Sequence, residues 1–367
     1  MSATLAILVL ASGVLAVHLA TVLLALRRLR PHQGTAGVIG TPRVTLLRPV
    51  CGLDPFDAET LTSSFRQDYP GFEVIFCAQR PDDPVIALIE RLIAAHPQVP
   101  ARLMIGDDPV SRNPKLNNVW KGWHAARHDW ICMTDSNLLL PPDYLATVVS
   151  AWREGTGLVS SPAVGIRPQG WGGHLECAVL NGNQARWQLA ADSLGDGFAQ
   201  GKTLFFNRPL LERAGGLRAL GRLIAEDAAA THVVRGLGLK VRLTPMPFAQ
   251  PVGRRSLRQV WDRQLRWSRV RRDGFPGLFA LEGLNSALPL ALVLAGLGNL
   301  GVALAFLALW YAAEWHLTRR AGWPATWRDA LALPLRDAML PALWLATWRR
   351  RGFTWRGTPM DEAPARP

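Results

Sequence analysis

Apolar residues are spaced along the middle of the chain in two ways, which predict strands and helices in turn. Short apolar runs typical of buried strands lie at residues 44–50, 72–78, 102–105, 130–133, 157–160 and 198–206. Apolar residues at helical spacing lie between them, at 57–65, 85–95, 119–126, 144–152, 175–192 and 228–234. Strands that alternate with helices in this way indicate an α/β fold with a doubly wound, mainly parallel sheet.

The N-terminal stretch is apolar over the length of a membrane-spanning helix. Ala3 to Leu26 has His18 as its one strongly polar interruption, and a helix of this length can cross a bilayer. Arg27, Arg28 and Arg30 follow, so the positive-inside rule places this end in the cytoplasm. A cleaved signal peptide is the alternative. The length of the run and the position of the positive charge after it disfavour a signal peptide.

The C-terminal region also predicts membrane helices. Residues 284–315 are apolar with glycines at 296–301, which predicts a helical hairpin that ends at the cytoplasmic Arg319-Arg320. Residues 331–348 contain Arg336 and Asp337, which are costly in lipid, so we expect an interfacial or re-entrant helix there. The expected domains are therefore a transmembrane helix (1–30), a cytoplasmic α/β domain (31–275), a membrane hairpin with an interfacial helix (276–356) and a disordered tail (357–367).

Composition supports contact with membranes and with anions. Of the 367 residues 49% are hydrophobic and 19% are charged, and the net charge is +13. A basic chain favours phosphate groups or acidic lipid. We expect no nucleic-acid partner, because the arginines cluster beside apolar runs and no nucleic-acid-binding motif is present. The four cysteines lack CxxC spacing, which favours buried thiols in a reducing compartment.

The stretch from Trp130 to Asn137 places an acid at the carboxyl end of a predicted buried strand. In open α/β sheets this edge is where ligands bind. Asp135, with Ser136 and Asn137, offers oxygen ligands suited to Mg²⁺ or Mn²⁺ that already carries a diphosphate. The alternative is an aspartate that caps the turn before Pro141.

Further candidate residues follow other predicted strands or begin predicted helices. Asp82 and Asp83 could accept hydrogen bonds from a ribose or base, or could cap the next helix. Lys115 stands beside a helix N-terminus, where an ammonium group suits a phosphate. Glu226 and Asp227 begin a helix, where acids are favourable in any case. In an active site, one of these two acids would be a general base.

A last motif, Gln264-Leu265-Arg266-Trp267, lies on a predicted helix rich in arginine. Arginines beside a membrane bind lipid phosphate and would also bind a leaving diphosphate. Trp267 offers a flat face for a sugar or a lipid head group.

In their order and spacing these motifs resemble the ceramide glucosyltransferase family, membrane-bound enzymes with a GT-A fold that are related to cellulose synthase. The resemblance covers roughly residues 40 to 275. The matching motifs are Gly52-Leu53-Asp54-Pro55, Gln67-Asp68-Tyr69-Pro70, Asp82-Asp83-Pro84, Asn113-Pro114-Lys115-Leu116-Asn117-Asn118, Asp135-Ser136, Ala214-Gly215-Gly216-Leu217, Ala225-Glu226-Asp227 and Gln264-Leu265-Arg266-Trp267.

The resemblance implies an inverting transferase that uses a UDP-sugar and a membrane lipid as acceptor. UDP-glucose is the donor expected first, with UDP-galactose, UDP-glucuronate and UDP-N-acetylglucosamine as alternatives. It implies that Asp83 contacts the nucleoside, Asp135 holds the diphosphate through Mg²⁺ or Mn²⁺, and Asp227 is the base. It also implies that Arg266 and Trp267 close the acceptor side. We therefore expect Asp227 and Glu226 to be catalytic, and the donor site to contain Asp82, Asp83, Lys115, Asp135, Gln264, Arg266 and Trp267. The expected location is a bacterial inner membrane, with the GT-A domain in the cytoplasm.

Two departures from the usual motifs bear on the substrate and the metal. Asn137 stands where the GT-A metal motif usually has a second acid, which ceramide glucosyltransferases also lack. Residues 184–186 read Gln-Ala-Arg where eukaryotic members have His-Pro-Arg. Ceramide is the first expectation for the acceptor from the resemblance, and the second departure leaves diacylglycerol and a hopanoid as alternatives. A polysaccharide synthase is disfavoured because a translocation channel needs more spans, and a non-enzymatic scaffold is disfavoured because the motif series is intact.

Overall fold

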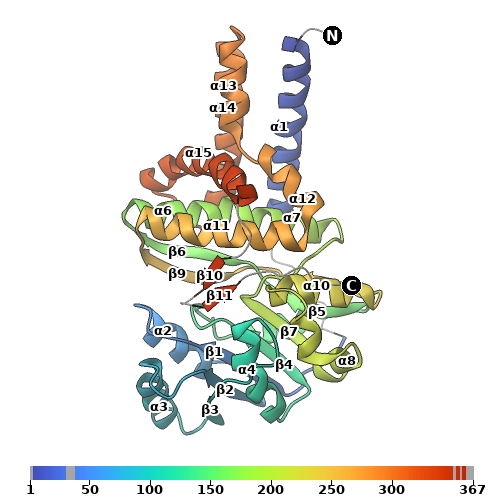
Figure 1. The fold of residues 1–367 in the computed structure, drawn as a ribbon, viewed down its shortest axis with the longest axis vertical. Coiled ribbons are helices and arrows are strands. Elements are labelled where there is room, and N and C mark those ends of the chain that lie inside the picture. The colour runs from blue at the N-terminus through green and yellow to red at the C-terminus, as the bar shows by residue number, and fades with distance from the viewer. Residues whose placement is uncertain (1–2, 30–37, 350–352, 356–357, 361–367) are drawn as a thin grey trace. The chain divides into compact units, whose positions relative to one another are not determined.

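The computed structural model describes residues 3–29, 38–349, 353–355 and 358–360. These residues form two compact units, and each unit is assembled from separate stretches of the chain (Figure 1). The sheet unit comprises the described residues of Arg30–Val164 and Ala191–Pro251. The helical unit comprises those of Met1–Leu29, Gly165–Ala190 and Val252–Pro367.

The sheet unit is built on seven strands in the order β3-β2-β1-β4-β7-β5-β8. Neighbouring strands are parallel except at β7, which is antiparallel to both β4 and β5. The predicted doubly wound, mainly parallel sheet is therefore present. The strands are β1 (Val44–Val50), β2 (Phe72–Ala78), β3 (Ala101–Ile105), β4 (Trp130–Thr134), β5 (Thr156–Ser160), β7 (Thr203–Asn207) and β8 (Lys240–Leu243).

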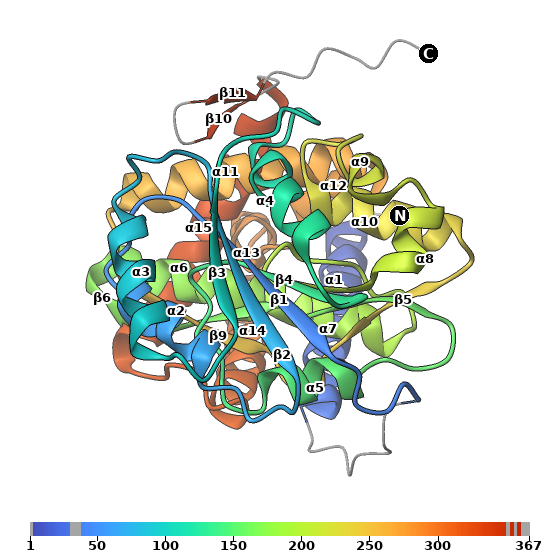
Figure 2. The same ribbon diagram turned by 90° about the horizontal axis from the view of Figure 1, so that it is seen from below.

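Helices cover both faces of this sheet because its strands are apolar on both faces. Leu46 of β1 packs into one apolar core and its neighbour Leu47 into the other, as the alternation of side chains along a strand requires. Figure 2 shows α2 and α3 on one side of β1–β3 and α4 on the other. The helices of this unit are α2 (Asp57–Thr62), the 3₁₀ turn η1 (Ser63–Phe65), α3 (Val85–Ala95), α4 (Pro114–Ala125), α5 (Tyr144–Ser150), α8 (Arg208–Arg213), α9 (Gly216–Leu220) and α10 (Glu226–Gly236).

The helical unit gathers helices from the beginning, the middle and the end of the chain. They are α1 (Ala3–Arg28), α6 (Gly170–Ala178), the π-helical turn η2 (Val179–Ala185), α7 (Arg186–Ser193), α11 (Leu257–Gly274), α12 (Pro276–Leu281), the 3₁₀ turn η3 (Glu282–Leu284), α13 (Ala287–Gly296), α14 (Leu300–Arg320) and α15 (Trp327–Arg349). The last residues of α7 belong to the sheet unit. Two paired strands, β6 (Ala163–Gln169) and β9 (Phe248–Arg254), also carry the chain from one unit to the other.

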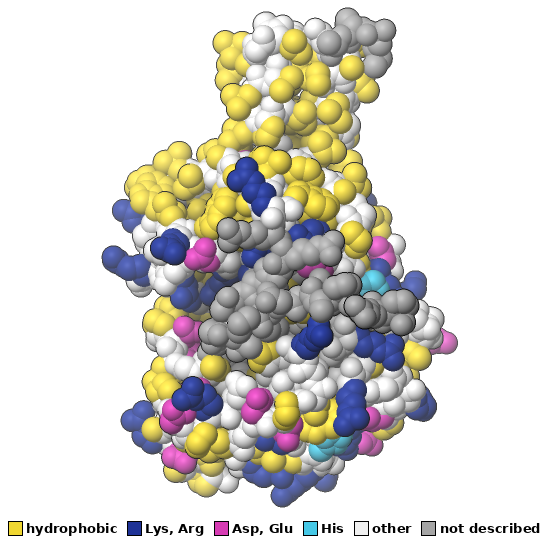
Figure 3. Space-filling view, viewed as in Figure 1, with side chains coloured by type: hydrophobic (Ala, Val, Ile, Leu, Met, Phe, Trp, Pro, Cys, Tyr) yellow, Lys and Arg dark blue, Asp and Glu magenta, His cyan; other side chains and the backbone are white. Residues whose placement is uncertain are grey.

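Within the described residues, two helices are long and apolar enough to cross a membrane, α1 and α14. A bent pair, Pro276–Leu284 with Ala287–Gly296, would make a third span if it acts as one. α1 packs against α14, where the ring of His18 stacks on Trp310 with 3.5 Å between centroids. Side chains exposed on these helices are mostly apolar (Figure 3). The predicted hairpin corresponds to α13 and α14, separated at Gly296–Leu300.

Several element boundaries differ from the predictions. Helix α4 begins at Pro114 rather than near residue 119, because Asn113 caps it and proline suits the first helical position. Strand β7 begins at Thr203 rather than 198, because the chain turns between Gln200 and Thr203. The predicted helix 175–192 is interrupted by η2, where Asn181 exchanges two hydrogen bonds with the backbone of Gly165.

The predicted domain boundaries also differ from the observed units. The segment 31–275 is shared between both units, because α6 and α11 pack with α15, and η2 packs with α6 and α14. In the predicted disordered tail 357–367, Thr358–Met360 forms strand β11, which pairs with β10 (Phe353–Trp355). The remainder of that tail lies outside the described residues.

Candidate functional site

The carboxylate of Asp135, directly after β4, is held between two lysines. Lys115 Nζ lies 2.7 Å from Asp135 Oδ1, and Lys202 Nζ lies 3.0 Å from Oδ2. Lys202 Nζ also donates to Asn137 Oδ1 at 2.9 Å. Both oxygens of the predicted metal ligand are therefore ion-paired, one with the predicted Lys115 and one with Lys202, which the sequence analysis did not identify.

Lys115 also reaches the second predicted acidic pair. Its Nζ lies 2.7 Å from Glu226 Oε1 and donates to the Gly201 carbonyl at 2.7 Å. The lysine is placed in the first turn of α4 because Asn113 is the N-cap, with its Oδ1 accepting from the Lys115 backbone N–H at 2.8 Å. Asn113 Nδ2 donates to Glu226 Oε2 at 2.8 Å. One asparagine therefore fixes both the start of the helix and the position of Glu226.

Asp227 follows Glu226 but has no ion pair within the described part of the chain. Its Oδ2 accepts from the Gly201 N–H and its Oδ1 from the Ala228 N–H, each at 2.8 Å. A Cβ added at Gly201 would lie 2.8 Å from Glu226 Oε1 and 3.4 Å from Asp227 Oδ2. Glycine at this position is what lets the backbone approach both acids.

Burial and charge give these groups different proton affinities. Burial opposes the charge on Lys115, but the carboxylates of Asp135 and Glu226 outweigh it and hold the pKa of Lys115 above its ordinary value. For Asp135, Lys115 and Lys202 outweigh burial and hold its pKa well below the usual range. Burial, and then the charge of Glu226, raises the pKa of Asp227 to about 6. The cluster thus contains one acid that titrates near neutral pH.

Asp82 and Asp83 lie in the loop after β2 but have different contacts. Asp82 is exposed and forms an ion pair with Arg80 at 2.5 Å. Both carboxylate oxygens of Asp83 accept from the Gly52 N–H at 3.0 Å, and Oδ1 also accepts from the Val85 N–H at 3.0 Å. The hydrogen bond from the Val85 N–H, at the start of α3, supports the alternative in which Asp83 caps this helix. A contact between Asp83 and a nucleoside stays a prediction. Gly52 has φ +67, the left-handed region that favours glycine.

Gln264, Arg266 and Trp267 lie on α11, which is part of the helical unit. Gln264 is buried, and its Nε2 donates to Glu176 Oε2 at 3.3 Å while its Oε1 accepts from Gln184 at 3.1 Å. Trp267 packs against a small core of Cys177, Leu180 and Val252. The structure therefore brings Lys115, Asp135, Glu226 and Asp227 together in the sheet unit, and it holds the QxxRW motif within the helical unit.

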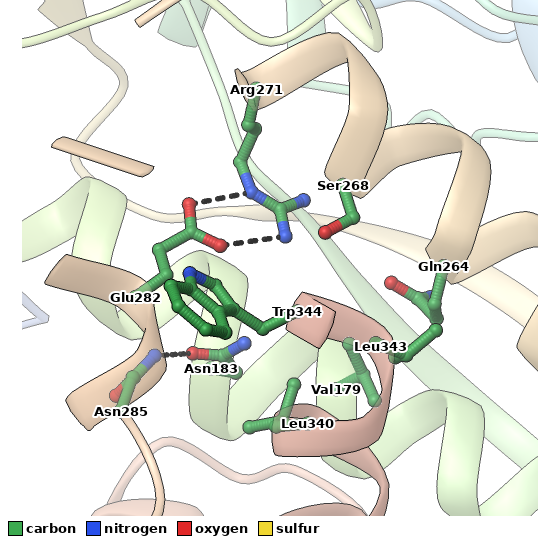
Figure 4. A pocket seen from close by; sticks show the side chains of 10 residues that line it. All are labelled: Val179, Asn183, Gln264, Ser268, Arg271, Glu282, Asn285, Leu340, Leu343 and Trp344. Carbon is green, nitrogen blue, oxygen red and sulfur yellow. Dashed lines mark hydrogen bonds and ion pairs between the residues drawn. The ribbon is translucent and has the colours of Figure 1, made fainter. Parts of the chain in front are cut away.

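The helical unit contains a pocket beside the QxxRW helix (Figure 4). Its empty volume is about 360 Å³, which includes space open to solvent. Arg271 and Glu282 form a two-bond ion pair on one side of the pocket, at 2.8 and 2.9 Å. Ser268 directs its hydroxyl toward the pocket, and Trp344 and Leu340 supply an apolar wall. The lining residues are Val179, Asn183, Gln264, Ser268, Arg271, Glu282, Asn285, Leu340, Leu343 and Trp344.

Two residues of the site, Lys202 and Gly201, were not predicted from the sequence, and Asn113 was predicted only as part of the motif that contains Lys115. Lys202 and Gly201 lie inside a segment predicted to be a strand, so their turn was not visible. One signal was available for Lys202, because the chain has 41 lysines and arginines and nearly all of them are arginine. Asn113 precedes a proline, a pattern that could have been recognised as an N-cap followed by the first helical residue.

The oxygens around Asp135 do not by themselves make a metal site. The described part of the chain contains no group of three or more His, Cys, Asp or Glu residues placed to hold a metal. Asp135 offers one carboxylate and Asn137 one amide oxygen, and both are already bonded to ammonium groups. Mg²⁺ prefers six oxygens and usually takes several from substrate phosphates and water.

Comparison with known proteins gives a consistent set of similarities. The profile of the family described as Glycosyl transferase family 21 matches residues 4–364. A Ceramide glucosyltransferase 1 from Caenorhabditis elegans is 27% identical over 264 residues, which cover 71% of this chain and 56% of the relative. A Ceramide glucosyltransferase from Komagataella phaffii is 42% identical over 112 residues, which cover 29% of this chain and 22% of the relative. The chain therefore spans less than two thirds of the length of these relatives.

Among solved structures, the chain is similar to a mannosyltransferase from Pyrobaculum calidifontis in complex with GDP-Man and Mn²⁺. The TM-score is 0.55 at 20% identity, and the match covers 94% of this chain and 99% of the other. At this identity the similarity concerns the fold, and it confirms the predicted GT-A-like architecture.

Proposed function

Because the chain belongs to glycosyl transferase family 21, we propose that it is a hexosyltransferase that moves a sugar from a UDP-sugar to the hydroxyl of a membrane lipid. Glucose is the sugar expected first, and ceramide the acceptor expected first. The observation that carries the proposal is the cluster of Lys115, Lys202, Asp135 and Glu226 beside Asp227. It combines cations suited to a leaving diphosphate with a carboxyl group suited to take a proton.

The charges of the cluster fit a displacement with inversion at the anomeric carbon. The departing diphosphate gains negative charge, which the ammonium groups of Lys115 and Lys202 stabilise. Asp227 takes the proton of the attacking hydroxyl, while Glu226 stays ion-paired with Lys115. No second carboxylate nucleophile is needed, in contrast to a retaining glycosidase. Asp83 is assigned to the nucleoside, as the family resemblance implies.

A divalent cation completes this donor site in our proposal. Mg²⁺ or Mn²⁺ would neutralise charge on the diphosphate, with Asp135 as the ligand from the protein. Because the protein offers so few oxygens here, the cation would take most of its ligands from the diphosphate and from water. Mn²⁺ accompanies GDP-Man in the Pyrobaculum calidifontis structure, and that complex concerns that protein alone.

We assign the pocket beside α11 to the polar head of the acceptor lipid. Its amide and hydroxyl side chains, Asn183, Asn285, Gln264 and Ser268, can pair with the amide and hydroxyl groups of a ceramide. The same segment that supplies Glu282 exposes Leu278, Leu281 and Leu284, which suits a position at a lipid surface. Diacylglycerol has fewer hydrogen-bond donors than ceramide and would form fewer hydrogen bonds with these side chains.

We further propose a multi-pass protein of a bacterial inner membrane, with α1 and α14 as spans and the sheet unit in the cytoplasm. Both helices end in arginine pairs, Arg27-Arg28 and Arg319-Arg320, which favour the cytoplasmic side. Helix α15 would lie along the surface, because its exposed stripe is apolar while Arg336 and Asp337 are buried. The stripe consists of Trp327, Leu331, Leu335, Leu345 and Trp348.

The function is tested by mass spectrometry of total lipids from a host with and without the gene. We expect a new or lost glycolipid whose fragments identify the sugar and the lipid, and Asp227→Asn expressed at the same level should behave like the host without the gene. Purified protein given UDP-glucose with ceramide, diacylglycerol or a hopanoid alcohol then ranks the acceptors. An unchanged lipid profile together with no transfer to any of the three would overturn the proposal.

A further inference from the structure

The ammonium group of Lys202 contacts both Asp135, the proposed metal ligand, and Asn137. Its Nζ lies 3.0 Å from Asp135 Oδ2 and 2.9 Å from Asn137 Oδ1. They are two of the oxygens that this loop could offer a metal, and the other oxygen of Asp135 is paired with Lys115. The ammonium group of Lys202 thus contacts both of these oxygens, which would otherwise be available to a divalent ion.

We propose that Lys202 is a built-in cation that keeps divalent metal off Asp135 until a nucleoside diphosphate binds. This inference rests on the proposed function, which supplies the diphosphate as ligand. It goes further by making metal binding conditional on the nucleotide.

The charges around Asp135 explain why metal alone would bind poorly. A cation that arrives by itself meets two ammonium groups within 3.0 Å of the carboxylate. To take Oδ2 it must displace Lys202, which is 7% exposed, and separate that buried ammonium group from the Asp135 carboxylate. Breaking a buried ion pair is unfavourable.

A diphosphate removes this obstacle. Its oxygens accept hydrogen bonds from a lysine as readily as a carboxylate does, so Lys202 can turn to the phosphate. The same phosphate oxygens give the metal the ligands that the protein lacks. The side chain can move while its backbone stays, because the neighbouring Gly201 is bonded on both sides, through its N–H to Asp227 and through its carbonyl to Lys115.

Coupling of this kind is reciprocal, so nucleotide must strengthen metal binding by the same factor as metal strengthens nucleotide binding. Removing the positive charge of Lys202 should therefore weaken the coupling between the nucleotide and the metal. A neutral side chain at this position should make binding of metal alone tighter, whereas the loss of an ordinary phosphate-binding lysine would leave it unchanged.

In the experiment, electron paramagnetic resonance measures the concentration of free Mn²⁺ in solutions of the full-length protein in detergent. The measurement is made with and without UDP. For the unaltered protein we expect UDP to tighten Mn²⁺ binding by at least about tenfold, within the usual range of coupling between sites. In Lys202→Met, Mn²⁺ alone should bind about tenfold more tightly than to the unaltered protein, and the effect of UDP should shrink.

Two further variants test whether the effect depends on a positive charge at residue 202 and whether removing a lysine elsewhere has the same effect. Lys202→Arg keeps the positive charge and should still exclude Mn²⁺ in the absence of UDP. Lys240→Met removes an exposed lysine at the start of β8 and should leave both affinities unchanged. Thermal melting curves establish that each variant is folded.

The outcomes distinguish this inference from the proposed function. Equal affinity of the unaltered protein for Mn²⁺ with and without UDP overturns the inference by itself, even if Lys202→Met does not fold. A folded Lys202→Met with no gain in affinity for Mn²⁺ alone also overturns it. If UDP binds neither with nor without Mn²⁺, the proposed donor is wrong and the inference falls with it.

Discussion

The two adjacent acids at the start of α10 differ in what surrounds them. Glu226 is engaged by Lys115 and Asn113, whereas the carboxylate of Asp227 accepts hydrogen bonds from the backbone N–H groups of Gly201 and Ala228. Burial and the neighbouring charge of Glu226 raise the pKa of Asp227 to about 6. A carboxyl group of this kind can exchange a proton near neutral pH, which is what a general base requires.

Asp227→Asn should therefore lower the transfer rate by roughly 10²–10⁴-fold, the range of general acid–base catalysis, while UDP affinity stays nearly unchanged. The rate of the unaltered enzyme should fall as pH drops below about 6, because the protonated carboxyl cannot act as a base. The residual rate of Asp227→Asn should lack this fall. The measurement is initial rate against pH for both proteins.

Protein stability should change in the opposite sense over the same range. An acid whose pKa is raised on folding stabilises the fold while it is protonated, and this contribution is lost as pH rises from about 4 to about 6. A loss of activity below pH 6 without loss of folded protein thus isolates the chemical effect. If Glu226→Gln abolishes turnover and Asp227→Asn does not, Glu226 is the base.

Gly201 offers a second test at the residue scale. Its missing side chain leaves room for Glu226 Oε1, which would lie 2.8 Å from an added Cβ. Gly201→Ala should push Glu226 away from Lys115 and reduce activity by at least about tenfold, since misplacing a group by 1 Å costs up to 10²-fold. Gly236→Ala, in the last turn of α10 with open space around it, is the matched control. Similar activity in both variants would show that Glu226 does not need this position.

At the scale of elements, α4 connects the fold to the site. Asn113 caps the helix through its Oδ1 and holds Glu226 through its Nδ2, so one side chain has two separable duties. An aspartate at position 113 would still cap the helix but could not hold Glu226, because a carboxylate can accept hydrogen bonds and cannot donate them.

Asn113→Ala should lower the free energy of unfolding by about 1 kcal/mol through loss of the cap. Asn113→Asp should retain most of the cap but place a negative charge against Glu226, so its activity should fall more than its melting temperature. The two quantities, melting temperature and transfer rate, are measured on both variants. Full activity of Asn113→Asp would mean that Glu226 needs no support from α4.

The elements were predictable from the sequence to different degrees. Apolar runs identified β1, β2 and α3 because their side chains face a core on a regular period. Strand β7 was misplaced at its start, since the turn at Gly201 is stabilised by Asp227, 26 residues away in the chain. The two lysines meet Asp135 through contacts between residues that are far apart in the chain. The sequence indicated Lys115 because it lies in a motif, whereas no motif indicated Lys202.

At the scale of the whole molecule, the helical unit is held together by buried charges as well as apolar contacts. Arg336 of α15 makes two bonds to Glu314 of α14, at 2.8 and 3.1 Å, and also pairs with Asp337 at 2.6 Å. Arg186 of α7 lies 3.9 Å from Glu314. Asp337 Oδ2 accepts from the first N–H of α13 at 3.2 Å. Four helices thus meet at one network.

Glu314→Gln should lower the free energy of unfolding by about 3 kcal/mol, because it leaves buried arginines with less counter-charge. The measurement is thermal or denaturant unfolding in detergent. Asp262→Asn, which breaks the exposed Arg258–Asp262 pair, is the control and should cost less than about 1 kcal/mol. Equal stability of both variants would show that the network does not hold the helices.

The division of the helical unit into three stretches sets an order for its biosynthesis. All stretches of the sheet unit have been synthesised once residue 251 has been added to the chain. Arg186 and His174 are made early, but their acidic partners Glu314 and Asp329 follow more than 100 residues later. We therefore expect the nascent chain to carry an unmatched arginine and histidine until α14 and α15 emerge. Completion of this unit is then the last event in the assembly of the protein at the membrane.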